Sequence, residues 1–442
     1  SEEYLTEEKY MKELLEEKLA EEIKIFRENI KPNFKIFEYF PKSEGTVNDF
    51  VNYFNSRYEK LSKIIKQRVD YKDVEEIKSI KENTNTKIIG MIREKRTTKE
   101  NVTILTVEDK TGVVDVYINE TLEYGDKKEH LETLKILPRL VPDEVIGIKG
   151  RVGKNKKITA TEIVEPDIPN LNGANRNRAN NDIYVAFLSD LHIGSYLFME
   201  KEFKNFIDWV NLKGNRKEIA ENLKYILIAG DIVDGVGVYP EQKDELSIPD
   251  IYKQYKFTAR LLKEIPEEIE IFMIVGNHDA VPLAEPQLPV SKEFAEDLYK
   301  MKNVHILPNP SLIIIENVKI LMYHGASMDK LISAIPGLSY SAPEKAMEEL
   351  LKKRHLNPIY KDIYPTEKDY LVIEEIPDII HCGHLHTNGY GIYKGVYLIN
   401  SGTFQRRSKY QEQLGHFPTP GKVPIMNLKN FSRIELNFNI QP

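Results

Sequence analysis

Apolar positions recur at helical spacing through the first eighty residues. In the opening stretch the repeated residues are Leu5, Leu14, Leu15, Leu19, Ile23 and Phe26, and a period near 3.6 residues predicts a helix. Thr46, with Asp49 three residues later, is typical of a capping box at the start of a second helix. One apolar stripe follows, made of Phe50, Tyr53, Phe54, Tyr58, Leu61, Ile64 and Ile65. The pattern predicts a helical N-terminal segment over residues 1–80, with the stripe in a core or a partner interface.

Residues 81–168 carry short, β-branched and partly alternating apolar runs. The runs are TKIIGMI (86–92), NVTILTVED (101–109), VVDVYIN (113–119), EVIGIKGRV (144–152) and KITATEIVE (157–165). A Leu- and Glu-rich stretch at 127–137 predicts a helix after the third run. Five strands with a helix after the third is the order of an OB-fold barrel. OB-folds often bind single-stranded nucleic acid, but only Tyr117 and Tyr124 are offered for stacking, so a binding barrel and a purely structural barrel both stay open.

The rest of the chain predicts a linker and a larger domain. Residues 169–182, PNLNGANRNRANND, are polar and Asn-rich, which is typical of a linker. From residue 183 to 442, apolar runs such as IYVAFLSD, YILIAGD and IEIFMIVGNHD alternate with helical patterns. This alternation predicts a layered α/β domain with buried sheets over 183–442.

Composition narrows the class of protein. The charged fraction is 30% and the hydrophobic fraction 41%, as in ordinary globular domains. No stretch approaches the roughly 20 apolar residues of a membrane span, so we expect no membrane partner. The one cysteine, Cys382, excludes an internal disulfide framework and indicates a cytoplasmic protein. The net charge of −7 argues against a uniformly basic nucleic-acid binder but leaves local basic patches open.

Polar side chains follow five predicted strands of the last domain, where α/β sheets bind their ligands. They are Asp190, His192, Asp231, Asn277, His278, Asp279, His324, His384 and His386. Any one of these is usually a turn or capping residue, but five such places in succession predict a shared site. Imidazole nitrogens with carboxylate and amide oxygens suit divalent ions such as Mn²⁺, Zn²⁺ or Fe²⁺.

The chemistry of such a site assigns roles by residue type. Two divalent ions about 3.5–4 Å apart need a carboxylate that bridges them, and Asn or His cannot supply two oxygens. A histidine that binds no metal can stabilise charge on a leaving oxygen or donate a proton to it. A glycine stands directly before three of the candidates, in Gly230, Gly276 and Gly383, and lets the backbone turn sharply and approach the metals.

In chain order these residues read SDLH (189–192), GD (230–231), GNHD (276–279), HG (324–325) and GHLH (383–386). That set resembles the motifs of the calcineurin-like metallophosphoesterases. The resemblance implies one metal held by Asp190, His192, Asp231 and His386, and a second held by Asp231, Asn277, His324 and His384. It further implies that Asp231 bridges the metals, that His278 is catalytic, and that Asp279 orients His278.

Longer stretches resemble the small-subunit family of archaeal D-family DNA polymerases. They are NDFVNYFNSRYEKL (48–61), FLSDLHIGS (187–195), KKRHLNPIY (352–360), DYLVIEEIPDIIHCGHLH (369–386) and TPGKVPIMNL (419–428). In that family the N-terminal region is usually longer. The implied fold class is α/β, an OB-fold β-barrel followed by a calcineurin-like α/β/β/α phosphoesterase domain, with a helical N-terminal segment.

The same resemblance implies an activity and partners. The small subunits of eukaryotic replicative polymerases share the architecture without the metal ligands, whereas this chain keeps them all. The implied activity is a proofreading 3′→5′ exonuclease with two divalent ions, Mn²⁺ first and Zn²⁺, Fe²⁺ or Ni²⁺ next. The implied partners are single-stranded or mismatched DNA 3′ ends and the large catalytic subunit of the polymerase, in the nucleoid-associated cytoplasm.

Three further residues are candidates for DNA contacts. Tyr239, Arg406 and Arg407 could meet phosphate oxygens, which arginine forks suit, although ordinary surface positions would look the same. Two other functions stay open: a non-catalytic scaffold that bridges the large subunit and replication factors, and a stand-alone metallophosphatase or phosphodiesterase.

Overall fold

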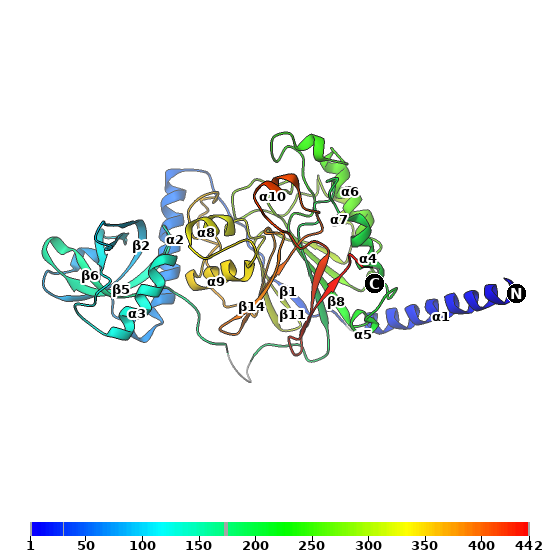
Figure 1. The fold of residues 1–442 in the computed structure, drawn as a ribbon, viewed down its shortest axis with the longest axis horizontal. Coiled ribbons are helices and arrows are strands. Elements are labelled where there is room, and N and C mark those ends of the chain that lie inside the picture. The colour runs from blue at the N-terminus through cyan, green and yellow to red at the C-terminus, as the bar shows by residue number, and fades with distance from the viewer. Residues whose placement is uncertain (1, 30, 172–175, 441–442) are drawn as a thin grey trace.

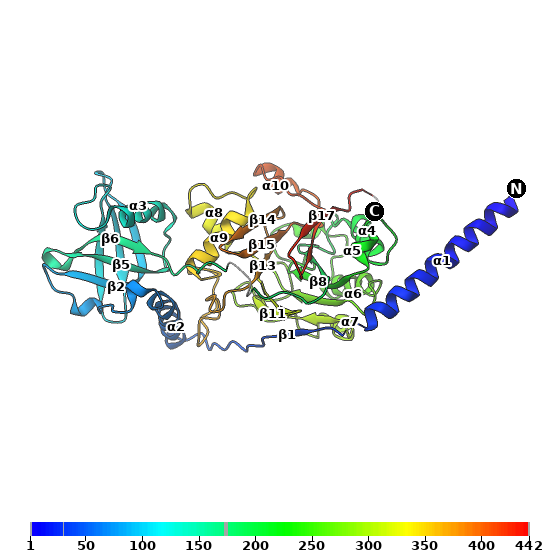
Figure 2. The same cartoon turned by 90° about the horizontal axis from the view of Figure 1, so that it is seen from below.

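The molecule is elongated, with three parts in a row (Figures 1 and 2). A computed structural model describes residues 2–29, 31–171 and 176–440. A closed β-barrel lies at one end, a two-sheet α/β lobe forms the middle, and helix α1 projects from the other end. None of the helices in these ranges is long and apolar enough to cross a membrane. The predicted fold class, a barrel before an α/β/β/α lobe with a helical N-terminus, is confirmed.

The N-terminal segment departs from the prediction in one respect. Helices α1 (Glu2–Asn29) and α2 (Val47–Lys66) form as expected, and α2 begins at the predicted capping box of Thr46 and Asp49. Between them, however, residues 34–36 form strand β1 (Phe34–Ile36) rather than helix. This strand pairs antiparallel with β11 (Ser311–Ile315) of the α/β lobe. A segment predicted as purely helical thus completes the edge of a distant sheet.

The barrel has the predicted order of elements. Its strands are β2 (Asn85–Thr97), β3 (Thr103–Glu108), β4 (Val113–Ile118), β5 (Val145–Val152) and β6 (Ile158–Val164), closed in the order β2-β3-β4-β6-β5. Helix α3 (Lys127–Ile136) follows the third strand, as predicted. Short 3-10 turns lie at η1 (Val69–Tyr71), η2 (Ile77–Ser79), η3 (Leu137–Arg139) and η4 (Lys154–Lys156). The barrel interior is filled by aliphatic side chains such as Ile88, Leu105 and Ile148.

The α/β lobe contains two six-stranded sheets, ordered β1-β11-β12-β13-β15-β14 and β10-β9-β8-β7-β16-β17. The remaining strands are β7 (Tyr184–Leu188), β8 (Leu223–Ala229), β9 (Glu270–Ile274), β10 (Val304–Ile306), β12 (Val318–Met322), β13 (Ile379–Cys382), β14 (Asn388–Tyr393), β15 (Val396–Ser401), β16 (Lys422–Asn427) and β17 (Arg433–Asn437). The lobe's helices are α4 (Glu200–Val210), α5 (Lys217–Ala220), α6 (Ile251–Leu262), α7 (Glu296–Tyr299), α8 (Met328–Ala334), α9 (Pro343–Lys353), α10 (Lys409–Gln413) and the 3-10 turn η5 (Gln242–Glu245).

Three apolar layers hold the lobe together. Phe187 and Phe272 of one sheet share a core with Ile320 and Ile399 of the other, so the sheets pack face to face. Helices α4 and α6 cover the outer face of the β7–β10 sheet, and α8 and α9 pack against the sheet that contains β13 and β15. Helices on both outer faces of two stacked sheets bury the apolar faces of the sheets.

The predicted linker over 169–182 includes residues 172–175, which lie outside the described residues. Its described flanks are bonded to the lobe. The backbone N–H of Leu171 donates to the carbonyl of Lys394 at 2.8 Å, and Arg176 donates to the carbonyl of Asp378 at 3.0 Å. The flanks therefore run along the surface of the α/β lobe.

The barrel and α2 meet the lobe over two buried ion networks, which we call the junction networks. In the first, Lys353 of α9 lies 2.8–3.3 Å from carboxylate oxygens of Glu144, Glu165 and Glu349, and Arg139 pairs with Glu165 and Glu349.

The second junction network centres on Arg57 of α2. Its guanidinium donates to Asp369 at 3.0 Å and to the hydroxyl of Tyr53 at 2.7 Å, and His355 lies 2.8 Å from the same Asp369 carboxylate. Both networks join residues more than 180 positions apart in the chain, so they fix how the barrel and α2 sit on the lobe.

Candidate metal centre

The fold brings the five predicted strand-end groups to one place. Strands β7, β8 and β9 are parallel neighbours in one sheet, and β12 and β13 are parallel neighbours in the other. Because parallel strands end at the same edge, the loops that follow them meet above the packed sheets. The seven predicted metal ligands and His278 all lie in these loops.

The backbone is strained where these side chains are attached. Five candidate ligands have left-handed backbone angles, namely Asp190, His192, Asp231, His384 and His386, with φ between 49° and 69°. Such angles cost non-glycine residues about 1–3 kcal/mol each, and they cluster at functional sites. The surrounding lobe holds this strain, which aims several side chains at one point.

Glycines leave room for the same side chains. A Cβ atom on Gly276 would lie 2.3 Å from Oδ1 of Asp231, and one on Gly383 would lie 2.4 Å from Oδ2 of Asp190. Both contacts are far inside van der Waals distance. The two glycines are therefore required by close packing against the aspartates, whereas the sequence predicted them only as points where the backbone turns sharply and approaches the metals.

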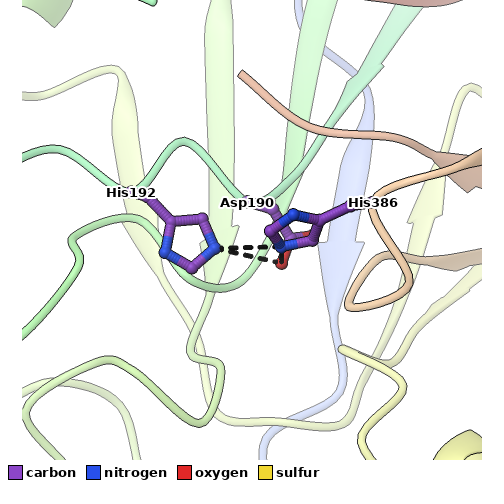
Figure 3. A group of neighbouring side chains, drawn as sticks. All are labelled: Asp190, His192 and His386. Atoms are coloured by element: carbon purple, nitrogen blue, oxygen red, sulfur yellow. Dashed lines mark hydrogen bonds and ion pairs between the residues drawn. The ribbon is translucent and has the colours of Figure 1, made fainter. Parts of the chain in front are cut away.

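Three side chains form a first group, shown in Figure 3. Nε2 of His386 lies 3.2 Å from Oδ1 of Asp190, and Nε2 of His192 lies 3.6 Å from the same oxygen. The two Nε2 atoms are 3.1 Å apart. Oδ1 of Asp190 is buried and receives no hydrogen bond from the described part of the chain. A buried carboxylate oxygen with two imidazole nitrogens beside it has the donor set of a divalent ion.

A second group contains Asp231, Asn277, His324 and His384. Nε2 of His324 lies 3.2 Å from Oδ2 of Asp231 and 3.0 Å from Oδ1 of Asn277, and Nδ1 of His384 lies 3.2 Å from the same amide oxygen. Oδ2 of Asp231 is also 3.6 Å from Nε2 of His192, in the first group. Asp231 is thus the carboxylate that lies between the two groups.

Outer hydrogen bonds decide which imidazole nitrogen faces inward. Nδ1 of His192 donates to Asp234 at 2.9 Å, and Nδ1 of His324 donates to the carbonyl of Ala229 at 2.7 Å. In both rings this leaves the lone pair of Nε2 for the centre of the site. Partners of this kind fix the tautomer and raise the basicity of metal-binding histidines.

The remaining pair of histidines is held differently. Nε2 of His384 donates to Asp329 at 2.6 Å, which leaves Nδ1 for the site. Nδ1 of His386 lies 3.1 Å from the amide nitrogen of Gln411 in α10. Gln411 also accepts the backbone N–H of Ser408 as part of a capping box, so the position of α10 depends on a side chain that contacts His386.

The structure corrects the assignment of Asp279. Its carboxylate accepts the hydroxyl of Tyr255 at 2.9 Å and the backbone N–H of Gly276 at 2.8 Å, and among the described residues it forms no hydrogen bond with the His278 ring. Nδ1 of His278 instead donates to the backbone carbonyl of Asp234 at 2.8 Å. Asp279 braces the loop, whereas Asp234 orients both His192 and His278. The sequence analysis missed Asp234, although it follows Asp231 by three residues in the same strand-end loop.

Histidine side chains lower the pKa values of the two aspartates at the centre of the site, Asp190 and Asp231. Burial by itself would raise the pKa of Asp231, but His324 and His278 outweigh burial and hold that pKa well below its ordinary value. Burial lowers the pKa of His324, but Asp231 and Asp190 outweigh it and raise the pKa to about 10. The pKa of Asp190 is lowered in the same way by His324 and His386.

Among the described residues, no lysine or arginine side chain is within ion-pair distance of Asp190, Asp231 or Asp234. Buried carboxylates are stable only when a positive charge or a metal compensates them. The donor set, the unbonded oxygen of Asp190 and the absence of a fixed cation in this part of the structure all fit divalent metal ions.

The three candidate DNA contacts lie near this centre in different surroundings. The ring of Tyr239 is 6.3 Å from that of His278, and its hydroxyl bonds to Glu245. Arg406 is exposed. Arg407 donates to the carbonyl of His416 at 2.6 Å and covers one face of Phe417.

Known proteins are similar to this chain over most of its length. The family model for the B-type subunits of DNA polymerases alpha and epsilon matches residues 185–389. The DNA polymerase II small subunit of Archaeoglobus fulgidus is 45% identical over 388 residues, which cover 86% of this chain and 75% of that protein. That of Methanothermobacter thermautotrophicus is 41% identical and covers 87% of this chain and 78% of its own length. A solved archaeal phosphodiesterase matches 57% of this chain and 99% of its own, with 14% identity and a TM-score of 0.31, too low to carry an argument.

Proposed function

Because the chain belongs to the family of archaeal DNA polymerase II small subunits, the D-family, we propose that its strand-end site is a 3′→5′ exonuclease that proofreads for the polymerase. The observation that carries the proposal is the donor set. Neighbouring donors form three overlapping sets that are linked through His192 and Asp231, namely Asp190 with His192 and His386, His192 with Asp231 and His278, and Asp231 with His324 and His384. Each set presents nitrogen and oxygen atoms within about one metal-coordination shell. A subunit with no catalytic task has no reason to keep five strained ligands.

Two divalent ions would be held by these groups, with Asp231 as the shared carboxylate. We propose Mn²⁺ as the first ion to test, with Zn²⁺, Fe²⁺ and Ni²⁺ as alternatives that the same donors accept. When bound, such ions polarise a phosphodiester and lower the pKa of water. The substrate would be the 3′ end of a single-stranded or mismatched DNA strand, and the partner would be the large catalytic subunit.

His278 would act beside the metals without binding one. Its Nδ1 is engaged by the carbonyl of Asp234, so Nε2 is the nitrogen left for a substrate oxygen. Burial lowers the pKa of His278, which keeps the ring neutral in the free site. A phosphate anion bound nearby would favour the protonated ring, which could then stabilise the leaving 3′ oxygen.

The test compares two histidine variants on DNA. The full chain, alone and with the large subunit, receives Mn²⁺ and a 5′-labelled strand with a matched or mismatched 3′ end. Wild type should shorten the strand one nucleotide at a time from the 3′ end. His278→Ala should lose this activity, because it removes the imidazole that would stabilise the leaving oxygen. His305→Ala is the matched control, since the side chains of His278 and His305 are 19% and 21% exposed and His305 pairs with Glu270 away from the site.

Three outcomes separate the candidate functions. Stepwise shortening that depends on His278 supports the exonuclease. No DNA cleavage by wild type in either form would leave the chain as a scaffold for the large subunit. Hydrolysis of small phosphomonoesters far faster than DNA would make it a phosphatase that only resembles its relatives.

A further inference from the structure

The segment between β15 and β16 lies against the candidate metal centre. The backbone N–H of Thr419 donates to the carbonyl of His386 at 2.9 Å. Gln411, earlier in the same segment, contacts Nδ1 of His386 at 3.1 Å. Two points of the segment are therefore fixed on one candidate ligand, and residues 412–418 between them form part of the border of the site. Helix α10, drawn in red in Figure 1, belongs to this segment.

Phe417 in this segment is exposed to solvent but has a cation on one face of its ring. Its side chain is 73% exposed, yet one face of the ring is covered by the guanidinium of Arg407, whose carbon lies 4.2 Å from the ring centroid. Arg407 is itself held, because its Nε donates to the carbonyl of His416 at 2.6 Å. A cation packed on one face leaves the other face open and the ring in one position.

The neighbouring residue is connected to the other metal-ligand group. The ring of His416 packs against that of Tyr340, with centroids 4.1 Å apart and the two planes tilted by 30°. The hydroxyl of Tyr340 donates to Asp329 at 2.7 Å, and Asp329 accepts Nε2 of His384 at 2.6 Å. The position of residues 416–417 is thus set from both sides, by contacts to His384 and to His386.

We propose that Phe417 selects unpaired 3′ ends by stacking its open face on a nucleobase of the strand whose phosphodiester enters the metal centre. This rests on the proposed function. Single-strand-binding proteins use aromatic rings beside cationic side chains in this way, because every base has a flat face. Arg406 and Lys409 are exposed on either side of Arg407 in the chain and offer positive charge to the DNA backbone. A paired terminal base must first leave its stack to reach Phe417, whereas a mismatched base is already loosened.

An exposed phenylalanine is also what a protein partner would bury. Two features favour the nucleobase. The ring is held by contacts that lead to His384 and His386, and a cation covers its other face. Docking of the large subunit on Phe417 is therefore an outcome of the test rather than a second proposal.

The test separates stacking from catalysis. A single strand with 2-aminopurine at its 3′ end is titrated with the full chain in EDTA, where no cleavage occurs, and stacking is read as fluorescence quenching. Wild type and Phe417→Trp should quench. Phe417→Ala should bind about 10-fold more weakly, within the range of about 5–150-fold that one stacked base contributes. Phe40→Ala is the matched control, because Phe40 is also 73% exposed and lies in the segment before α2.

Cleavage assays with Mn²⁺ complete the design. For Phe417→Ala we expect KM for single-stranded DNA to rise about 10-fold with kcat within about twofold, the mismatch preference to fall, and hydrolysis of bis(p-nitrophenyl) phosphate to stay unchanged. If wild type quenches but cleaves no DNA, the exonuclease proposal fails and the stacking role stands. If Phe417→Ala matches wild type in quenching, KM and mismatch preference, the stacking role is overturned. The stacking role would also be overturned if Phe417→Ala no longer bound the large subunit but kept the DNA affinity of wild type.

Discussion

The candidate metal centre and the junction networks both bury several carboxylates, but they neutralise them differently. At the junction, Lys353 and Arg139 supply fixed positive charges to Glu144, Glu165 and Glu349. Burial raises the pKa of Glu144 well above its ordinary value. The junction therefore contains its own fixed cations beside its buried carboxylates.

The metal centre has no such cation among the described residues. Histidines are the ionisable partners that lower the pKa of Asp190, Asp231 and Asp234, and Asp234 also accepts a hydrogen bond from the neutral amide of Gln242. When metals are absent, protonated histidines are the only positive charges available, which is why the pKa of His324 rises to about 10. Buried charge by itself therefore does not mark a functional site. A functional site is marked by a buried cluster of carboxylates that the protein's own residues cannot neutralise.

The largest expected effect comes from removing the shared carboxylate. Asp231→Asn leaves a single side-chain oxygen, although both metal-ligand groups need an oxygen from this residue. We therefore expect nucleotide release to fall at least about 10³-fold, the scale of losing a catalytic residue. The measurement is the rate of 3′ shortening with Mn²⁺. Asp369→Asn is the control, because Asp369 is equally buried but belongs to a junction network. It should keep its rate at temperatures where it stays folded. If Asp231→Asn retained more than about a tenth of the wild-type rate, Asp231 would not be the carboxylate on which the activity depends.

Removing a cation from the junction should affect stability instead. Lys353→Ala leaves three buried glutamates with Arg139 alone, and breaking a buried ion network in this way costs about 3–5 kcal/mol. Urea denaturation measures the loss. The variant should bind Mn²⁺ as wild type does, since Lys353 has no contact with the strand-end loops. Unchanged stability would show that the junction does not depend on its internal cations.

A smaller effect is expected from the residue that orients two histidines. Asp234→Asn keeps a side chain of the same shape but removes the charge beside Nδ1 of His192. Changes to such outer partners lower metal affinity or activity by about 10–100-fold. The concentration of Mn²⁺ that gives half of the maximal rate should rise accordingly, and excess Mn²⁺ should restore the rate. An unchanged Mn²⁺ requirement would contradict the role assigned to Asp234.

The two regions should also respond to pH in opposite directions in the metal-free chain. Burial and Arg57 lower the pKa of His355 to about 4, below its unfolded value of about 6.5, so junction stability is lost as pH falls from 6.5 toward 4. The pKa of His324 is raised to about 10, so its contribution is present below pH 6.5 and lost as pH rises through 10.

Thermal unfolding in EDTA tests this. We expect the Tm of wild type to fall on both sides of neutral pH, by roughly 2–4 °C for each kcal/mol lost. His355→Gln should flatten the acid side and His324→Gln the alkaline side. If both variants flattened the Tm profile on the same side of neutral pH, the assignment of the acid side to His355 and the alkaline side to His324 would be wrong.

Several features were predictable because they are local in sequence. The barrel order and the α/β alternation are read from runs of seven to eleven residues, and the capping box of Thr46 spans four. The candidate ligands were found because each directly follows an apolar strand, and parallel strands end at one edge. That rule needs no knowledge of which strands are neighbours.

The errors and omissions all involve long-range pairing. Strand β1 has only three residues and forms because β11, nearly 280 positions later, offers an edge. Asp279 was wrongly assigned because it adjoins His278 in the chain, whereas its carboxylate turns toward Tyr255. The junction networks join charges that look like ordinary surface residues until the barrel packs on the lobe.

If the strand-end site is completed by two divalent ions, metal binding can be counted directly. The most direct measurement is the number of Mn²⁺ ions bound per EDTA-treated chain, by equilibrium dialysis, with the protons released on binding counted in parallel. We predict two ions and net proton release for wild type and Lys353→Ala, and weaker binding for Asp231→Asn. Binding of no ion by wild type, or of two ions by Asp231→Asn with unchanged affinity, would contradict the claim.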